Sequence, residues 1–249
     1  MKKLFFFLCI ISQTLLAQSS NELFNNANIL YKQGNYEEAI HLYKKIESQK
    51  EISSALYYNL GNCYYKLNKV APTIYNYEKA LQLDPLNEDA LNNLAFAKRL
   101  TLDKIERLPK SFFQRFNKNY LQKLTYDQWA IFSVLFSILT SLLFFFFFFA
   151  QQSSKKRLFF TTSMTSLLLL TITLAISYNQ YNFFKSNKEA IIYSEKVAIK
   201  NAPTLNSNDV FTLHEGTKVN VLDSVDNWKK IKLADGKIGW ITTNDLKEL

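Results

Sequence analysis

Few side chains in this sequence are of the types that carry out catalysis or bind metals. The chain has two histidines, His41 and His214, and two cysteines, Cys9 and Cys63. Cys9 falls in an apolar N-terminal run, and a single remaining cysteine cannot form an internal disulfide. The two histidines lie far apart, so neither a metal site nor a nucleophile–base pair is apparent. The sequence therefore predicts a binding protein with no cofactor and no catalytic residues, rather than an enzyme.

The charge balance is basic, with a formal net charge of +9 over 249 residues. The lysines are scattered and form no arginine-rich block, so they do not indicate nucleic-acid binding. Hydrophobic residues make up 48% of the chain, and 21 of them are phenylalanines. This apolar content is concentrated in a few segments, and lysines beside membrane spans explain part of the basic excess.

The N-terminus has the three-part pattern of a secretory signal peptide. Two lysines follow Met1, the segment from Leu4 to Leu16 is mostly apolar, and Ala17 precedes polar sequence. We predict a signal peptide at residues 1–17, with cleavage after Ala17. If cleavage fails, the segment becomes a membrane anchor with its N-terminus inside, and the residues that follow are exported in either case.

Two later segments are long and apolar enough to span a membrane. The first, Trp129 to Ala150, has 22 uncharged residues, and the second, Leu158 to Tyr178, has 21. At about 1.5 Å per residue, each crosses a hydrocarbon core of roughly 30 Å. We predict transmembrane helices at 128–150 and 158–178, the first opened by a capping box of Thr125 and Gln128. The alternative, two buried helices of a soluble domain, is disfavoured because both runs are apolar on every side.

The short segment between the predicted spans indicates the orientation. Three of the seven residues at 151–157 are basic, which assigns this loop to the cytoplasm. The signal peptide independently places the residues from 18 to about 125 outside, and two spans return the chain to that side. We therefore predict a multi-pass protein of the inner membrane with both soluble parts in the periplasm.

A linker at 102–127 is predicted to contain an amphipathic helix at residues 110–124. Phe112, Phe116, Tyr120 and Leu124 recur every four residues among basic side chains. Two interpretations stay open: the helix lies at the membrane interface, or it packs on the preceding domain.

The N-terminal soluble part contains an internal repeat. Ile40 and Ile74 are 34 residues apart, as are Tyr43 and Tyr77. The second unit, 54–87, carries Tyr57, Leu60, Gly61, Tyr64, Tyr77, Ala80 and Pro85, and it departs from the pattern at Pro72 and Thr73. This pattern resembles the tetratricopeptide repeat, a pair of helices that stacks into a solenoid. Residues 18–101 are predicted to hold units at 20–53 and 54–87 and a final capping helix from Asp89 to about Leu100.

The repeat pattern also predicts how the helices pack and what they bind. Small side chains at Ala27, Gly61 and Ala95 should let helix backbones approach, and Tyr43 and Tyr77 should fill the space between neighbours. The resemblance implies a concave peptide-binding groove lined by the first helix of each pair. The groove residues that it implies are Asn25, Asn28, Tyr31, Lys32, Tyr58, Asn59, Asn62, Tyr65, Lys66, Asn92 and Asn93. Asparagine can both donate to and accept from a peptide backbone, although the repeat consensus carries such residues whatever the ligand.

Residues 187–249 change to short β-branched runs separated by turns. Val197 to Lys200, Lys218 to Leu222 and Trp228 to Leu233 are predicted strands, and Asp235-Gly236 is a predicted hairpin turn before Lys237 to Ile241. This order and spacing resemble the bacterial SH3 domain, which implies binding of peptides or peptidoglycan. Asp209 and Asp235 are expected to form turns rather than act as catalysts, and Trp240 is expected in the core.

The predicted architecture is therefore an all-α tetratricopeptide-repeat solenoid, a two-helix transmembrane hairpin and an all-β SH3-like barrel. This order resembles the BatE-type proteins of the Bacteroides aerotolerance operon, as do the segments Ile105 to Pro109 and Gln128 to Ala130. The resemblance implies a scaffold in a stress-related envelope complex. Its expected partners are membrane proteins with von Willebrand factor A domains and an ATPase of the MoxR type. The alternative is a protein that binds or senses peptidoglycan through the SH3 module.

Overall fold

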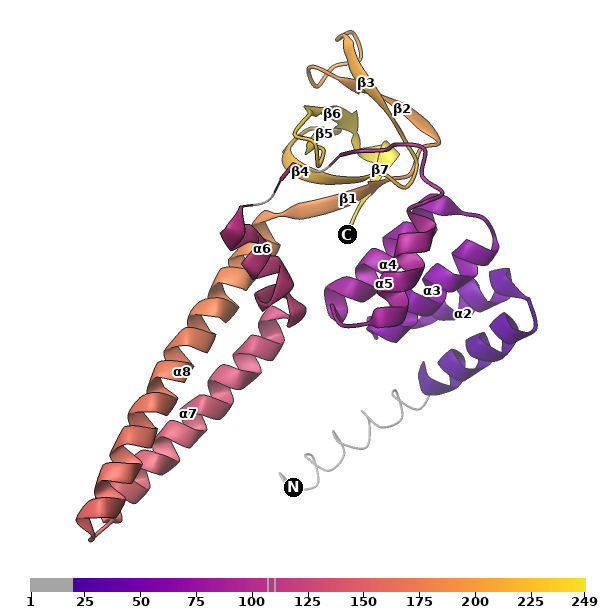
Figure 1. Cartoon of the computed structure of the whole chain (residues 1–249). Helices are drawn as coiled ribbons and strands as arrows, with labels where there is room; N and C mark the ends of the chain where they lie inside the picture. The colour runs from indigo at the N-terminus through magenta and orange to yellow at the C-terminus, as the bar shows by residue number, and fades with distance from the viewer. Residues whose placement is uncertain (1–19, 107, 110) are drawn as a thin grey trace, which may run out of the picture. The chain divides into compact units, whose positions relative to one another are not determined.

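The computed structural model describes residues 20–106, 108–109 and 111–249 (Figure 1). The predicted signal peptide lies outside the described residues. The chain forms two compact units: one combines the chain up to Leu108 with Glu189–Leu249, and the other is Pro109–Lys188. The apolar hairpin is thus an insertion between two parts of a single folded unit, and each unit is described by itself.

The repeat region is a series of antiparallel helices. It comprises a helix at 20–32, α2 (Tyr36–Ser48), α3 (Ser54–Lys66), α4 (Val70–Leu83) and α5 (Glu88–Ala97). The side chains of Ser53 and Asn87 accept hydrogen bonds from the first turns of α3 and α5, which satisfies donors that have no partner within the helix. Gly34 turns the chain into α2 with φ +85°, and Asn68 does the same before α4 with φ 55°. Both turns need the left-handed region, which glycine and asparagine tolerate best.

The packing between the repeats confirms two of the three predicted close approaches. Tyr43 and Tyr77 are 0% and 1% exposed. A Cβ atom at Gly61 would lie 2.5 Å from the Tyr77 ring, so only glycine fits there. Ala27 is fully buried, but the prediction for Ala95 was wrong. Ala95 is exposed, because α5 is the third unit's single helix among the described residues and no second helix there covers it.

The C-terminal part is a seven-stranded sheet of order β3-β2-β6-β5-β4-β1-β7. Its strands are β1 (Lys188–Ile192), β2 (Lys196–Lys200), β3 (Asp209–His214), β4 (Lys218–Val225), β5 (Trp228–Lys232), β6 (Ile238–Thr242) and β7 (Leu246–Glu248). The predicted turn at Asp235-Gly236 is confirmed between β5 and β6, with Gly236 at φ +98°. We refer to this part as the C-terminal sheet.

The prediction that Trp240 lies in the core was wrong. In β6 the inward positions are Gly239 and Ile241, and Ile241 is 0% exposed. A Cβ atom at position 239 would collide with Ile199, so only glycine fits at this inward position. The apolar pattern had assigned the inward position to Trp240 instead. Trp240 faces the other side of the strand, where Lys230 Nζ lies 5.8 Å from the centre of its ring.

The repeat region and the C-terminal sheet share a hydrophobic core. Ile191 of β1 is fully buried in a cluster with Ala71, Ile74 and Leu94. At Gly216, which has φ +82°, a Cβ atom would lie 2.9 Å from side-chain atoms of Ile74 and Thr101. This tight contact between the β3–β4 turn and the end of the repeats makes them one unit, whereas the sequence suggested separate modules.

Two carboxylates hold this shared interface together, and we call it the seam. Glu78 in α4 forms two ion pairs: one carboxylate oxygen lies 2.7 Å from Lys98 Nζ, and the other lies 2.8 Å from Lys218 Nζ of β4. Lys218 also pairs with Glu189. Burial alone would raise the pKa of Glu78, but the two ammonium groups outweigh it and hold the pKa at about 2.

Asp103 forms the second contact at the seam. Its Oδ2 accepts the His214 backbone N–H at 2.7 Å and the Thr217 hydroxyl at 2.6 Å, and its Oδ1 lies 2.8 Å from His214 Nδ1. Burial opposes ionisation of Asp103, but these hydrogen bonds prevail and its pKa is lowered. The start of the predicted linker, up to Leu108, thus belongs to the folded unit, with Ile105 packed against the core of the C-terminal sheet.

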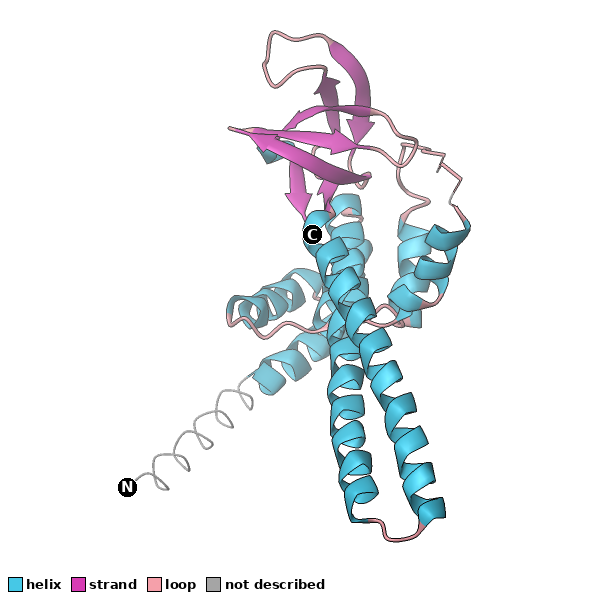
Figure 2. Ribbon diagram, turned by 90° about the vertical axis from the view of Figure 1, so that its left-hand side faces the viewer, coloured by secondary structure: helices cyan, strands magenta, loops and turns pink. Residues whose placement is uncertain are grey.

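The second unit contains α6 (Phe112–Asn119), the 3-10 turn η1 (Leu121–Lys123), α7 (Tyr126–Phe149) and α8 (Ser153–Ser186). The helices α7 and α8 lie side by side as a hairpin (Figure 2). The predicted capping box of Thr125 and Gln128 is confirmed, with hydrogen bonds of 2.9 and 3.2 Å. Both helices are long and apolar enough to cross a membrane.

Two details of the second unit differ from the prediction. The amphipathic helix ends at Asn119, because the chain tightens into η1 instead of continuing to residue 124. The connection within the hairpin is also shorter than 151–157: α8 begins at Ser153, so Lys155, Lys156 and Arg157 lie in its first turns.

Candidate peptide-binding groove

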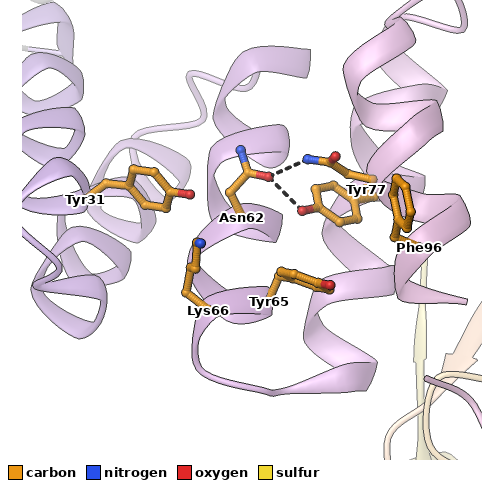
Figure 3. Close-up of a pocket in the computed structure, with 7 residues that line it drawn as sticks. Tyr31, Asn62, Tyr65, Lys66, Tyr77 and Phe96 are labelled. Carbon is orange, nitrogen blue, oxygen red and sulfur yellow. Dashed lines mark hydrogen bonds between the residues drawn. The ribbon is translucent and has the colours of Figure 1, made fainter. Parts of the chain in front are cut away.

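A cavity of about 240 Å³ opens among the helices of the repeat region. Its lining residues are Tyr31, Asn62, Tyr65, Lys66, Tyr77, Asn93 and Phe96 (Figure 3). Tyr65 and Phe96 are 39% and 53% exposed, so their rings are available to a ligand. The cavity thus combines aromatic surface, amide groups and one ammonium group, and we call it the groove.

Two identical hydrogen-bonded triads lie in the repeat region, 34 residues apart, and the second consists of residues that line the groove. In the first, Asn28 Oδ1 accepts from the Tyr43 hydroxyl at 2.5 Å and from Asn59 Nδ2 at 2.9 Å. In the second, Asn62 Oδ1 accepts from the Tyr77 hydroxyl at 2.7 Å and from Asn93 Nδ2 at 2.9 Å (Figure 3). Each triad joins the first helix of a repeat to its own second helix and to the next repeat.

The triads change the role assigned to the asparagines. Asn28, Asn59, Asn62 and Asn93 each use part of their hydrogen-bonding capacity to hold the stack together. Asn62 Nδ2 makes no hydrogen bond among the residues that the structure describes, so it can donate to a ligand. Asn62 therefore has one function in the stack, through Oδ1, and a second group, Nδ2, that remains available to a ligand.

The tyrosines of the triads act as neutral donors. Burial raises the pKa of Tyr43 and of Tyr77 well above the ordinary value, and burial also raises the pKa of Tyr31. The nearby Cys63 thiol is fully buried, and burial raises its pKa to about 12. A thiol in this state is not a nucleophile at neutral pH.

The other predicted groove residues are placed differently. Tyr58 is partly buried, and its ring lies 6.1 Å from that of Tyr77. Asn25, Lys32 and Asn92 are exposed and do not line the cavity. Tyr65 and Lys66 line the cavity, and so do Tyr31, Asn62 and Asn93.

Sequence reasoning missed Tyr77 and Phe96 as lining residues. Phe96 stands 34 residues after Asn62, so the repeat period itself could have identified it. Tyr77 was expected only as a core residue, but its hydroxyl reaches Asn62 at the cavity wall.

The side chains suited to catalysis do not converge in the described part of the chain. No group of three histidine, cysteine or acidic side chains there could hold a metal ion. His214 pairs with Asp103 at the seam, and the Thr217 hydroxyl donates to Asp103 rather than to the imidazole. This arrangement provides hydrogen bonds between two parts of the fold.

Comparison with known families agrees with this geometry. Two tetratricopeptide repeat families match the chain, one at residues 54–87 and the other at residues 20–49. The family described as the bacterial SH3 domain matches residues 195–247. No curated protein matches the chain as a relative. The protein therefore contains two tetratricopeptide repeats and a bacterial SH3 domain, which are modules of protein–protein interaction.

Proposed function

We propose that this protein is a membrane-anchored interaction scaffold that holds a partner's peptide segment in the groove. The observation that carries this proposal is the exposure of Tyr65 and Phe96 beside Lys66 and the free Asn62 Nδ2. Aromatic rings supply contact area at a low cost in side-chain entropy, and the amide can bind a peptide backbone. Catalytic and cofactor-binding roles form no part of this proposal.

The proposed setting is the periplasmic face of the inner membrane. The burial pattern of the hairpin supports it: the buried residues of α7 and α8 are serines and threonines, namely Ser133, Ser163, Ser166 and Thr173. Phe148 and Phe149 are 74% and 63% exposed. Apolar side chains outside and small hydroxyl residues between helices suit a lipid solvent rather than water.

The basic first turns of α8 support an orientation with the hairpin turn in the cytoplasm. A reporter fused at Ser154 should be active only as a cytoplasmic reporter. Activity of a periplasmic reporter at that site would overturn this topology.

The proposed partners are envelope proteins of a stress-related complex. They include membrane proteins with von Willebrand factor A domains, as the likeness in architecture to BatE-type proteins suggests. The role in aerotolerance is part of the same proposal.

Photocrosslinking of the full chain in native membranes tests the groove directly. A benzoylphenylalanine at Phe96 should capture a protein that mass spectrometry identifies. The matched control is the same probe at Leu91, which lies on the same helix, is 46% exposed and does not line the cavity. Identical products at both positions, or none at Phe96, would contradict peptide binding.

Variants of the aromatic residues complement the probe. The pair Tyr65→Ala and Phe96→Ala should lose the captured partner in a pull-down, and Leu91→Ala should retain it. These positions are better suited than Asn59 and Asn62, whose replacement would also break the triads and weaken the stack.

A second candidate function is binding of peptidoglycan by the SH3 domain. The outward placement of Trp240 beside Lys230 favours it, because an indole ring can stack on a sugar. The full chain should sediment with purified sacculi, and Trp240→Ala should not. The isolated C-terminal sheet is unsuitable for this test, since it would expose Ile191 of the shared core.

A further inference from the structure

The helix α6 presents large aromatic side chains on a single face. Phe112, Phe113 and Phe116 are 73%, 81% and 47% exposed, and Tyr120, directly after the helix, is 64% exposed. At about 100° per residue, these four positions fall within an arc of roughly 100°. No residue of α6 is buried.

This helix is also well defined at its start. The Ser111 side chain accepts the Gln114 N–H, and the Gln114 side chain accepts the Ser111 N–H. A capping box of this kind satisfies two backbone N–H groups that would otherwise lack a partner and so stabilises the start of the helix. The aromatic face therefore belongs to an ordered helix and not to a loop.

The turn after α6 is fixed to both long helices of its unit. The carbonyl oxygen of Leu121 in η1 accepts hydrogen bonds from Trp129 Nε1 of α7 at 3.0 Å and from Gln180 Nε2 of α8 at 2.6 Å. Figure 1 places α6 beside the ends of these helices that lie away from the hairpin turn. A bond from the Ser177 hydroxyl to the Tyr126 carbonyl joins α7 and α8 at this same end.

Aromatic residues mark the depth of this end. Tyr126 contacts Tyr181 and Phe184, with ring centres 5.7 Å apart in both pairs, and Trp129 lies in the next turn of α7. Tyrosine and tryptophan at the end of a membrane span are typical of the lipid–water interface. Because η1 is bonded to this end, α6 lies at the same level.

We infer that α6 is an interfacial helix whose aromatic face inserts into the outer leaflet of the lipid bilayer. Of the two interpretations that the sequence left open, this one gives the exposed rings an apolar environment. The inference rests on the proposed membrane location of the hairpin. It adds that the membrane contact extends beyond α7 and α8 to a third element.

Site-directed spin labelling tests this in the full chain. The protein, with Cys9→Ser and Cys63→Ala, would be reconstituted in vesicles of phosphatidylethanolamine and phosphatidylglycerol. Single labels at Phe113, Lys118, Leu139 and Leu91 would then be compared for access to oxygen and to a water-soluble nickel complex. Lys118 is the matched control, because it lies on the opposite side of α6 by helical geometry.

The expected result is graded. Leu139, in the middle of α7, should report the bilayer centre, Phe113 a shallow depth, and Lys118 and Leu91 water. A Phe113 label as accessible to nickel as Leu91, with Leu139 still in lipid, would overturn the inference alone. A Leu139 label in water would overturn the membrane location and this inference together.

Discussion

The two units of this protein bury opposite kinds of side chain. In the unit of repeats and sheet, large apolar residues such as Tyr43 and Ile191 are completely buried. In the hairpin the buried residues are hydroxyl side chains, whereas phenylalanines cover the outside. Water drives apolar groups inward, but a lipid solvent supplies no such force between helices, and small hydrogen-bonding residues then mediate helix contact. With the hairpin in the membrane, as proposed, exposure of an apolar residue has a different meaning in each unit.

The largest expected effect is on the seam of the first unit. Glu78→Gln removes a buried carboxylate and leaves the partly buried Lys218 with less compensation, and we expect a loss of about 3 kcal/mol in unfolding free energy. Thermal and urea denaturation of the full chain in detergent, followed by circular dichroism, measures it. Glu51→Gln, at an exposed loop position, should be close to neutral. Equal losses for both variants would show that the seam is not an ion-paired interface.

The same carboxylate predicts a pH dependence. The pKa of Glu78 in the folded state, about 2, is below its reference value of 4.5. Its stabilising contribution is therefore complete above about pH 4.5 and is lost as the pH falls towards 2. The lowered pKa of Asp103 acts in the same direction. Unfolding free energies measured across this range should fall less steeply for Glu78→Gln, and parallel curves would contradict this assignment.

A second pair of substitutions tests the contrast between the units directly. Leu139 and Leu91 are 44% and 46% exposed, yet only Leu139 lies in the proposed span. Leu139→Lys should oppose insertion by about 3 kcal/mol, a factor of more than 100 in the equilibrium, and carbonate extraction of membranes would detect it. Leu91→Lys should change stability by no more than about 0.5 kcal/mol. Similar behaviour of the two variants would remove the distinction between lipid and water as solvents.

A smaller effect is expected at the turn that joins the sheet to the repeats. Gly216→Ala places a side chain at a positive φ and against Ile74 and Thr101. We expect it to lower the free energy of unfolding by about 2 kcal/mol. Gly34→Ala is the control, because its φ is also positive but no atom lies within 4 Å of the added Cβ, so it should cost about 1 kcal/mol. Denaturation curves give the difference, which measures the contact at the seam. A loss at Gly216 no larger than that at Gly34 would mean that this contact contributes little.

The smallest effect concerns the hydroxyl groups inside the hairpin. Ser133 Oγ donates to Thr173 Oγ1 at 3.0 Å across the two helices, and Ser133→Ala should cost about 0.6 kcal/mol. Ser141→Ala, which removes a bond only within α7, is the control. The free energy of unfolding of the reconstituted protein, measured for each variant, should be lower for Ser133→Ala than for Ser141→Ala. No difference between them would assign hairpin stability to van der Waals packing alone.

Periodic features of this protein could be predicted from the sequence. The 34-residue repeat identified the stacked helices and placed Tyr43 and Tyr77 between them, and uncharged runs identified two long apolar helices. In the groove, Tyr65 and Lys66 stand 34 residues after Tyr31 and Lys32, and Phe96 stands 34 residues after Asn62. The triads were not foreseen, because an asparagine in a repeat looks the same whether it binds a ligand or another asparagine.

The sequence by itself determined which segments form helices, strands and apolar runs, since these depend on neighbours along the chain. Only the tertiary structure decided that the repeats and the SH3 domain form one unit. Asp103 meets His214 across 111 residues that include the whole hairpin, and a contact at that separation leaves no periodic signal. The tertiary structure likewise decided that Gly239, and not Trp240, faces the core. The close approach of Ile199 leaves no room for a side chain at that position.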